Sequence, residues 1–260
     1  MNGSNELGIS LSTRNYLQER LNPVPGDPFY LTLSDLSLAL KQIIPKIEQT
    51  GDRILDFGCG GSPYKSLFHR CSEYCRADLI GTPFIDFEMS QTDSSTQSNE
   101  KEFNIIFSSQ VLEHVESPEL YLKEALRLLK PNGTLILSTH GTYQDHPCPN
   151  DYWRWTASGL EKKLFEAGFK TKEKLFLTTG LRAAFCVFEM NLQKLGRGAF
   201  WTKVVCEAIE KICNILKIRK VAHILLDKIG PHYRVKNQFS PFSGIYITIL
   251  FVAEPFLKND

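Results

Sequence analysis

The sequence lacks three features that would assign it to other classes of protein: a long apolar run, paired cysteines and a charge of one sign. Its unbroken apolar stretch near the C-terminus, residues 249–253, is far shorter than the roughly 20 residues of a membrane-spanning helix. The polar start has no signal-peptide core, and none of the seven cysteines belongs to a C-x-x-C pair. We therefore expect a cytoplasmic globular protein with neither a disulfide framework nor a metal site.

The net charge of +1 hides a basic segment at residues 191–236, where ten lysines and arginines stand against three acids. The segment has three interpretations. It can form an outer face that covers a site or joins a second copy of the chain, or it can contact the anionic inner face of a membrane. The third is binding to nucleic acid, which we do not expect because no recognition module accompanies the basic residues.

Short apolar strands alternate with amphipathic helices through the middle of the chain. The alternation predicts a mainly parallel α/β sheet with helices on both faces. Strands are expected at 53–57, 74–80, 83–87, 102–109, 134–139 and 172–179, and helices at 34–47, 117–133 and 158–169, with another helix beginning at Ser62 and Pro63.

The alternation stops after Thr179. Apolar residues then recur three and four apart over 201–216, which predicts a long amphipathic helix, and the β-branched and aromatic residues of 244–255 predict a final strand. We therefore divide the chain into an N-terminal arm or lid (1–30), a core (31–180), a helical insertion (181–243) and the final strand of the core (244–260).

The stretch ILDFGCGGSP, residues 54–63, predicts a buried strand that ends at an acid and turns at glycines. Gly58 and Gly60 allow a sharp turn and the close approach of a ligand to the backbone. The dinucleotide fingerprint G-x-G-x-x-G would need a third glycine where Pro63 stands, so a pyrophosphate is not expected. Asp56 would instead accept hydrogen bonds from an ammonium group.

A second acid, Asp78, follows Asp56 by 22 residues, near the end of the second predicted strand. Folds of this kind place an acid there to accept the hydroxyls of a ribose. A ligand with an amino-acid end and a nucleoside end fits both acids, and S-adenosylmethionine is such a ligand.

The segments LDFGCGGSP, ADL and FNIIFSSQVLEHVESPELYLKEALRLLKPNGTLILST together resemble the class I S-adenosylmethionine-dependent methyltransferases, in the small-molecule subgroup that carries an LEH segment. The resemblance implies a Rossmann-like, seven-stranded sheet whose last strand is antiparallel. By position it implies a cofactor-binding set: Asp56, Gly58, Cys59 and Gly60 at the methionine part, Asp78 at the ribose, Asp86 and Phe87 at the adenine, and Ser109, Gln110 and His114 on the far side.

Methyl transfer is a direct displacement, in which alignment of the acceptor with the methyl group supplies most of the catalysis. For a hydroxyl acceptor, His140 or His146 in the loop after the fifth strand could act as the base, since the pKa of histidine lies near working pH. The segment DYWRWT, 151–156, resembles segments of glycan-pathway enzymes, which implies a lipid-linked or nucleotide-linked sugar bound by Tyr152, Trp153 and Arg154. The alternative is that these aromatic residues only hold the loop against the sheet.

Together these features predict a methyltransferase that acts on a small or glycan-related acceptor, at a hydroxyl oxygen, in a cleft at the carboxyl edge of the sheet. Two alternatives from other classes stay open. One is a regulatory protein that keeps the fold without turnover, and the other is a membrane-peripheral scaffold built on the insertion.

Overall fold

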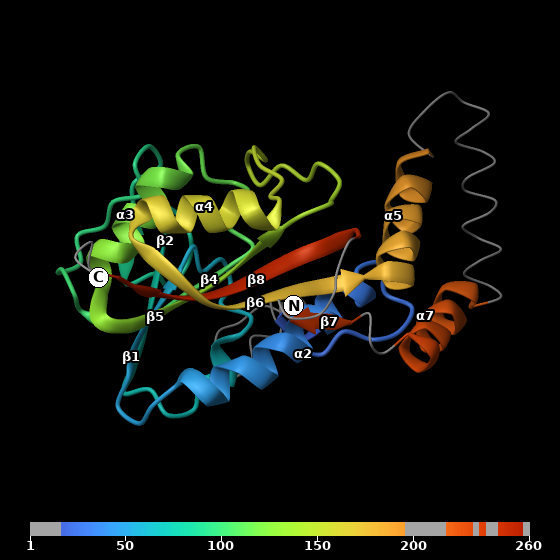
Figure 1. Ribbon diagram of the computed structural model, residues 1–260, viewed down its shortest axis with the longest axis horizontal. Coiled ribbons are helices and arrows are strands. Elements are labelled where there is room, and N and C mark those ends of the chain that lie inside the picture. The colour runs from blue at the N-terminus through green and yellow to red at the C-terminus, as the bar shows by residue number, and fades with distance from the viewer. Residues whose placement is uncertain (1–16, 196–216, 231–233, 238–243, 257–260) are drawn as a thin grey trace, which may run out of the picture.

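The computed structural model describes residues 17–195, 217–230, 234–237 and 244–256, which form one sheet flanked by helices (Figure 1). The helix predicted at 201–216 lies outside these residues. The strands are β1 Arg53–Phe57, β2 Glu73–Leu79, β3 Phe87–Met89, β4 Phe103–Ser109, β5 Leu129–His140, β6 Phe169–Thr179, β7 Val235–Asn237 and β8 Tyr246–Pro255. The helices are α2 Tyr30–Ile47, α3 Pro118–Leu128, α4 Ala157–Ala167, α5 Gly180–Leu195 and α7 Ile218–Ile229, with a 3₁₀ turn, η1, at Lys65–Leu67.

The strand order is β3-β2-β1-β4-β5-β8-β6-β7. Strands β1 to β5 pair in parallel, and β8 runs antiparallel to both β5 and β6. The predicted seven-stranded, mainly parallel sheet with an antiparallel last strand is confirmed. β7 adds an eighth, edge strand that the sequence does not predict, because three residues carry no periodic signal. From β1 the chain adds β2 and β3 on one side and then crosses to add β4 on the other, and this reversal of strand order opens a crevice at the carboxyl ends of β1 and β4.

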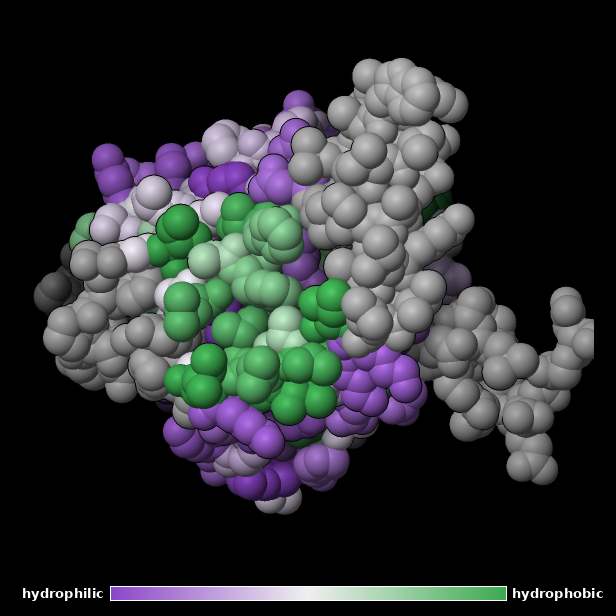
Figure 2. Space-filling model, turned by 90° about the vertical axis from the view of Figure 1, so that its right-hand side faces the viewer, coloured by the Kyte–Doolittle hydropathy of each residue, from purple (hydrophilic) through white to green (hydrophobic). Residues whose placement is uncertain are grey.

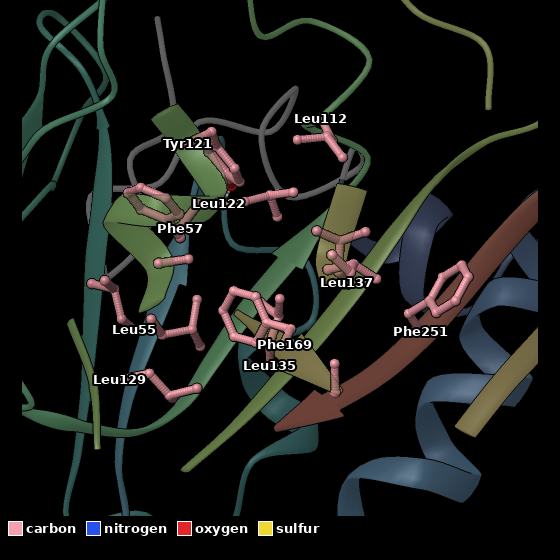
Figure 3. Packing of buried hydrophobic residues seen from close by; sticks show 14 of the residues in the cluster. Leu55, Phe57, Leu112, Tyr121, Leu122, Leu129, Leu135, Leu137, Phe169 and Phe251 are labelled. Carbon is pink, nitrogen blue, oxygen red and sulfur yellow. Dashed lines mark hydrogen bonds between the residues drawn. The ribbon is translucent and has the colours of Figure 1, made fainter. Parts of the chain in front are cut away.

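Successive side chains of each strand point to opposite layers of the molecule. In β1, Leu55 and Phe57 join a buried cluster that includes Leu122 of α3 (Figure 3), whereas Ile54 joins a second cluster that includes Leu40 of α2. Helices α3 and α4 accordingly cover one face of the sheet and α2 the other (Figure 1). The first strand is therefore buried on both sides, and its carboxyl end is held at a fixed place.

Two predicted helix ends are confirmed and one is wrong. Pro118 is the first residue of α3, and α4 ends at Gly168, whose φ of +101° suits glycine at this position. The predicted stop of α3 at 131–133 is wrong, since the helix ends at Leu128 and runs directly into β5. Gly133 lies inside that strand, where a Cβ would come within 2.9 Å of the Asn104 carbonyl oxygen.

The helix predicted to begin at Ser62 and Pro63 is also absent, and only the single turn η1 follows the glycines. Ser62 has a φ of +49°, a left-handed conformation instead of the extended one that is typical of a capping serine. The buried carboxylate of Glu48 accepts hydrogen bonds from the backbone N–H groups of residues 69, 70 and 71, at 3.1, 2.8 and 3.0 Å. The N–H groups bound to Glu48 are not available for the backbone hydrogen bonds of a helix. The chain therefore continues into β2.

Helices α5 and α7 are joined to α2 by a group of buried charges, here called the arginine cluster (Asp35, Arg182, Asp227 and Arg234). Arg182 is fully buried and lies 2.7 Å from both Asp35 of α2 and Asp227 of α7. Arg234, just before β7, donates to Asp35 at 2.9 Å. The described part of the predicted insertion is thus tied to the core by charge pairs.

On the side of the molecule where α5 and α7 lie, hydrophobic side chains gather at the surface (Figure 2). The exposed apolar residues of these two helices are Leu181, Phe188, Ile218, Val221, Ile224, Leu225 and Ile229. Within the described ranges, no helix is both long enough and apolar enough to cross a bilayer.

Candidate active site

A cavity of about 820 Å³ opens at the carboxyl ends of the parallel strands. Its volume lies within the roughly 300–1,000 Å³ of small-molecule sites. One part of its lining is the glycine wall (Asp56, Gly58, Cys59, Gly60 and Asp78), and another part contains His114, His140 and His146. We call these three histidines, with Glu113 behind them, the histidine wall. Glu19, Arg20 and Phe29, from the described part of the predicted arm, also line the cavity.

The glycines of the turn differ in what surrounds them. A Cβ on Gly58, whose φ is +77°, would lie 2.4 Å from a methyl carbon of Val111. Gly60 has a φ of +49°, and nothing within 4 Å would meet its Cβ. Gly58 is therefore required by internal packing, whereas Gly60 leaves its backbone open to a ligand.

Asp56 is the next-to-last residue of β1, and its side chain is almost completely buried. Burial raises the pKa of its carboxyl to about 7, against the opposing hydrogen bond that the Tyr74 hydroxyl donates at 2.7 Å. Among the described residues no lysine, arginine or histidine forms an ion pair with it. A buried acid without a cationic partner suits a ligand that brings its own positive charge.

Asp78 holds the turn in shape. Its Oδ2 accepts the Gly60 N–H at 2.6 Å, and its Oδ1 accepts the Leu79 N–H at 2.7 Å. A carboxylate oxygen accepts more than one hydrogen bond, so both oxygens can still take the hydroxyls of a ribose. Burial raises the pKa of the neighbouring Cys59 thiol to about 12, which keeps it protonated and leaves it a small residue that fits the turn.

Asp86 and Phe87, the predicted adenine residues, do not line the cavity. Asp86 accepts the backbone N–H of Arg76 at 2.9 Å, and the Phe87 ring packs edge-on against Phe103. The segment 89–92 just beyond them lines the cavity instead. It folds back through a bond from the N–H of residue 90 to the carbonyl of residue 95, at 2.9 Å.

Ser109 and Gln110, at the end of β4, line the cavity as predicted residues of the far side. Gln110 has a φ of +58°, and its N–H donates to the Ser138 carbonyl at 2.9 Å. Its side-chain Nε2 donates to the Ser138 hydroxyl at 3.2 Å, while its Oε1 is buried without a hydrogen-bond partner. An orphaned acceptor at the cavity is available to a ligand.

The three histidines lie against one another. The ring centre of His146 is 4.8 Å from that of His114 and 5.0 Å from that of His140. Burial lowers the pKa of His140 well below its ordinary value, and burial also lowers the pKa of His146. Both proposed bases are therefore neutral at physiological pH, which is the state that accepts a proton.

Glu113 is a functional candidate that sequence reasoning misses. It is fully buried, and burial raises the pKa of its carboxyl to about 7. Its Oε2 accepts the Thr139 hydroxyl at 2.8 Å, and its Oε1 has no hydrogen-bond partner, with His140 Nε2 3.4 Å away. The signal that could have found it is the LEH segment, in which Glu113 precedes His114.

Of the three predicted acceptor residues, Tyr152 lines the cavity and Trp153 and Arg154 do not. Trp153 donates through Nε1 to the Val115 carbonyl at 2.8 Å. Arg154 makes a two-pronged contact with Asp151, at 2.6 and 2.5 Å. These two side chains hold the loop in place, which is the alternative that the sequence left open.

Comparison with known proteins bears on this geometry. A family model described as a methyltransferase domain matches residues 32–169, which is more than half of the chain. The chain belongs to this methyltransferase family. A ubiquinone biosynthesis O-methyltransferase of Xanthomonas oryzae pv. oryzae (strain PXO99A) is 25% identical over 114 residues, covering 38% of this chain and 48% of that protein. The chain thus spans about half the length of the curated relatives it matches.

Solved structures share the fold at low sequence identity. Phosphoethanolamine N-methyltransferase 2 of Haemonchus contortus, in complex with S-adenosyl-L-methionine, is 14% identical, with a TM-score of 0.52, covering 95% of this chain and 56% of that one. An S-adenosylmethionine-dependent methyltransferase from Thermotoga maritima is 12% identical, with a TM-score of 0.51, covering 84% and 89%. At these identities the likeness establishes the Rossmann-like methyltransferase fold.

S-adenosylmethionine is the cofactor of this family, and the residues present fit it. The unpaired carboxyl of Asp56 matches the ammonium group, and the open space beside Gly60 matches the close approach of the ligand. Asp78 retains lone pairs for two hydroxyls. These three features lie along one lining of one cavity.

Proposed function

We propose that the protein transfers a methyl group from S-adenosylmethionine to a hydroxyl oxygen of a small acceptor. The observation that carries the proposal is the single cavity that joins the glycine wall to the histidine wall. A cofactor on the first wall would present its reactive end to a space lined by His140 and His146, both neutral at physiological pH. Such a space can hold an acceptor and take its proton.

The glycine wall is proposed to bind and orient the cofactor. Asp56 would pair with the ammonium group, and Asp78 would accept the ribose hydroxyls while it keeps the Gly60 turn in shape. The cofactor supplies a methyl group on a sulfonium sulfur. The segment 89–92, in place of Asp86 and Phe87, would lie against the adenine.

The histidine wall holds and moves a proton. His140, with its Nδ1 free of hydrogen bonds, would accept the proton of the acceptor hydroxyl. The acceptor oxygen then forms its bond to the methyl carbon as the carbon–sulfur bond breaks, and the electron pair of that bond goes to sulfur. His146 is the second candidate base, since its side chain also lines the cavity.

The acceptor is proposed to be small or glycan-related, as a lipid-linked or nucleotide-linked sugar would be. Tyr152 and Phe29 offer aromatic surfaces at the cavity, and the curated sequence relatives, which are named O-methyltransferases, support oxygen as the methylated atom. We further propose that the chain acts in the cytoplasm and that residues 17–29, the described part of the predicted arm, form a lid over the cavity that they line. The membrane contact predicted for 191–236 is proposed for its described helix α7, whose exposed apolar residues suit it. A role without turnover remains the alternative, because the fold alone does not fix the reaction.

The first experiment is a calorimetric titration of the purified chain with S-adenosylhomocysteine, the demethylated product. Binding is expected, and Asp78→Ala should weaken it by about 1.5 to 3 kcal/mol, the range for a hydrogen bond to a charged group. Asp86→Ala is the matched control, since Asp86 lies outside the cavity, and it should leave the affinity unchanged. Lack of binding at millimolar ligand would reject the proposal.

Turnover is then measured with methyl-labelled S-adenosylmethionine and a panel of hydroxylated acceptors, namely free sugars, nucleotide-linked sugars, lipid-linked sugars and phenols. Label recovered as an ether on one class identifies the acceptor. Binding of the cofactor without transfer to any class, or label recovered on nitrogen, would contradict the assignment of oxygen.

A further inference from the structure

Three side chains of the histidine wall converge from two separate parts of the chain. Glu113, His114 and His146 each present one ligand atom, and these atoms all lie within 4.8 Å of one another. Glu113 and His114 follow β4, whereas His146 belongs to the loop after β5. The fold, and no single local motif, brings them together.

Each of the two histidines has one ring nitrogen engaged. His114 Nδ1 lies 2.6 Å from the carbonyl oxygen of Asn150, which can only accept, so this nitrogen carries the proton. His146 Nδ1 lies 3.1 Å from the Asp151 carboxylate and 3.2 Å from the carbonyl of Gln144, which are also acceptors. In a neutral imidazole this leaves a lone pair on Nε2, the form in which histidine binds metals.

The third group supplies a negative charge with an unused oxygen. Glu113 is fully buried, and its Oε1 has no hydrogen-bond partner. A buried polar atom left unpaired is unfavourable, and native proteins pair nearly all of them. A cation between Glu113 and the two histidines would satisfy this oxygen.

A second shell already holds His146 in place. The Asp151 carboxylate accepts a hydrogen bond from the ring of His146. Its two oxygens also accept hydrogen bonds from Arg154, at 2.6 and 2.5 Å. A carboxylate behind a histidine is the usual support of a metal ligand. Support of His146 gives Asp151 and Arg154 of the DYWR segment a role, whereas the proposed acceptor site gives them none.

We propose that Glu113, His114 and His146 bind one divalent transition-metal ion, with Asp151 and Arg154 as positioning residues. Two imidazoles and one carboxylate form the ligand set of catalytic zinc and of non-haem iron sites, and three protein ligands leave a position open toward the cavity. Magnesium is disfavoured, because it takes oxygen ligands and retains its water.

Binding requires a modest contraction of the cluster. Ligand atoms about 2.1 Å from a tetrahedral zinc ion lie about 3.4 Å apart. The widest pair, now within 4.8 Å, would therefore close by about 1.4 Å, which rotations of three side chains can supply. An ion there would lower the pKa of an acceptor hydroxyl bound beside His140. That role, unlike the binding itself, rests on the proposed function.

The test is a titration of the chelator-treated full chain with Co²⁺, followed by its visible absorption and by competition with Zn²⁺. One Co²⁺ per chain is expected, displaced by one Zn²⁺, and both His146→Ala and Glu113→Gln should lose at least tenfold in affinity. Asp151→Asn should lose about 10- to 100-fold, as second-shell changes do. His69→Ala, an exposed histidine outside the cavity, is the matched control and should bind as the wild type does.

Two measurements keep the result decisive. Cys148, exposed and also at the cavity, is replaced in a Cys148→Ser background so that no thiolate contributes to the spectrum. Titration of His146→Ala with S-adenosylhomocysteine checks that this variant keeps its fold. Lack of Co²⁺ binding at millimolar metal, or equal binding by wild type and folded His146→Ala, would overturn the inference.

Failure of the proposed function gives a different pattern. Co²⁺ bound with the expected variant losses, but no methyl transfer to any acceptor, supports the metal site and rejects the proposed function. Methyl transfer that is unaffected by chelator and by His146→Ala rejects the metal and keeps the proposed function.

Discussion

The arginine cluster and the cavity both contain buried charged groups, and only in the arginine cluster are these groups paired with opposite charges of the chain. In the arginine cluster, Asp35 accepts from Arg182 at 2.7 Å, from Arg234 at 2.9 Å and from the Thr178 hydroxyl at 2.9 Å. At the cavity, Asp56 has the hydroxyl of Tyr74, and one oxygen of Glu113 has no hydrogen-bond partner.

The difference in pairing distinguishes buried charges that stabilise the fold from buried charges that are available to a ligand. Charges that serve the fold are paired within the chain, because an unpaired buried charge costs several kcal/mol. Charges left incompletely paired beside a cavity are retained at that cost for a ligand, and burial has raised the pKa of both Asp56 and Glu113 to about 7. Substitutions in the arginine cluster should therefore affect stability, and those at the cavity should affect binding.

The largest effect is expected from Asp35→Ala. It leaves Arg182 buried with part of its compensation removed, which should lower the free energy of unfolding by about 3 to 5 kcal/mol in urea titrations. Glu73→Ala removes one partner of the exposed pair with Arg53 and should cost at most about 1 kcal/mol. Equal losses in the two variants would show that pairing in the arginine cluster adds nothing beyond a surface pair.

The next effect concerns sterics in the glycine wall. Gly58→Ala meets Val111 at 2.4 Å in a left-handed conformation, so the two penalties together should cost about 2 to 4 kcal/mol. Gly60→Ala has the left-handed conformation but open space, and should cost about 1 to 2 kcal/mol. Thermal unfolding compares them, and Gly58→Ala combined with Val111→Ala should recover part of the loss. No recovery would place the strain elsewhere.

The glycine wall could be predicted from sequence because its parts are local. Asp56, Gly58 and Gly60 lie within five residues, and Asp78 lies one strand further along. The register of β1 with β2 then places Asp78 next to the turn. Parallel pairing of consecutive strands makes this arrangement nearly automatic.

The histidine wall could be predicted only in part. The sequence identifies His114, His140 and His146 one by one, but the approach of His146 to within 4.8 Å of Glu113 depends on how the loop after β5 turns back. That path is set by Arg154 and Asp151, whose pairing no periodicity encodes.

Asp86 and Phe87, which the sequence predicts at the adenine, lie outside the cavity because the path of a loop again decides which residues line it. The polar segment that follows β3 folds back into the cavity through backbone hydrogen bonds, and sequence spacing cannot distinguish it from a loop that turns away.

The last effect is the pH dependence that Asp56 imposes, which is at most about 1.4 kcal/mol for each pH unit. Its pKa is about 7 in the folded chain and near 4 when unfolded, so between these values the folded state holds an extra proton. Stability of the ligand-free protein should therefore fall as pH rises from 4 to 7. Asp56→Asn should make this slope shallower by the contribution of Asp56, because the amide oxygen can still accept from Tyr74 and carries no charge. The contribution of Glu113, whose pKa burial also raises to about 7, should stay.

Affinity for S-adenosylhomocysteine should follow the opposite slope. Below pH 7 the Asp56 carboxyl must lose its proton before it can pair with the ammonium group, so affinity rises up to about tenfold for each pH unit and levels off above 7. Asp56→Asn should bind more weakly, with a flat profile. Opposite slopes in the wild type, with the stability slope shallower and the affinity slope absent in Asp56→Asn, would show that one carboxyl lowers stability in order to bind a cation. If both slopes were unchanged in the variant, the charge would lie elsewhere in the cavity, and the contrast with the arginine cluster would no longer rest on Asp56.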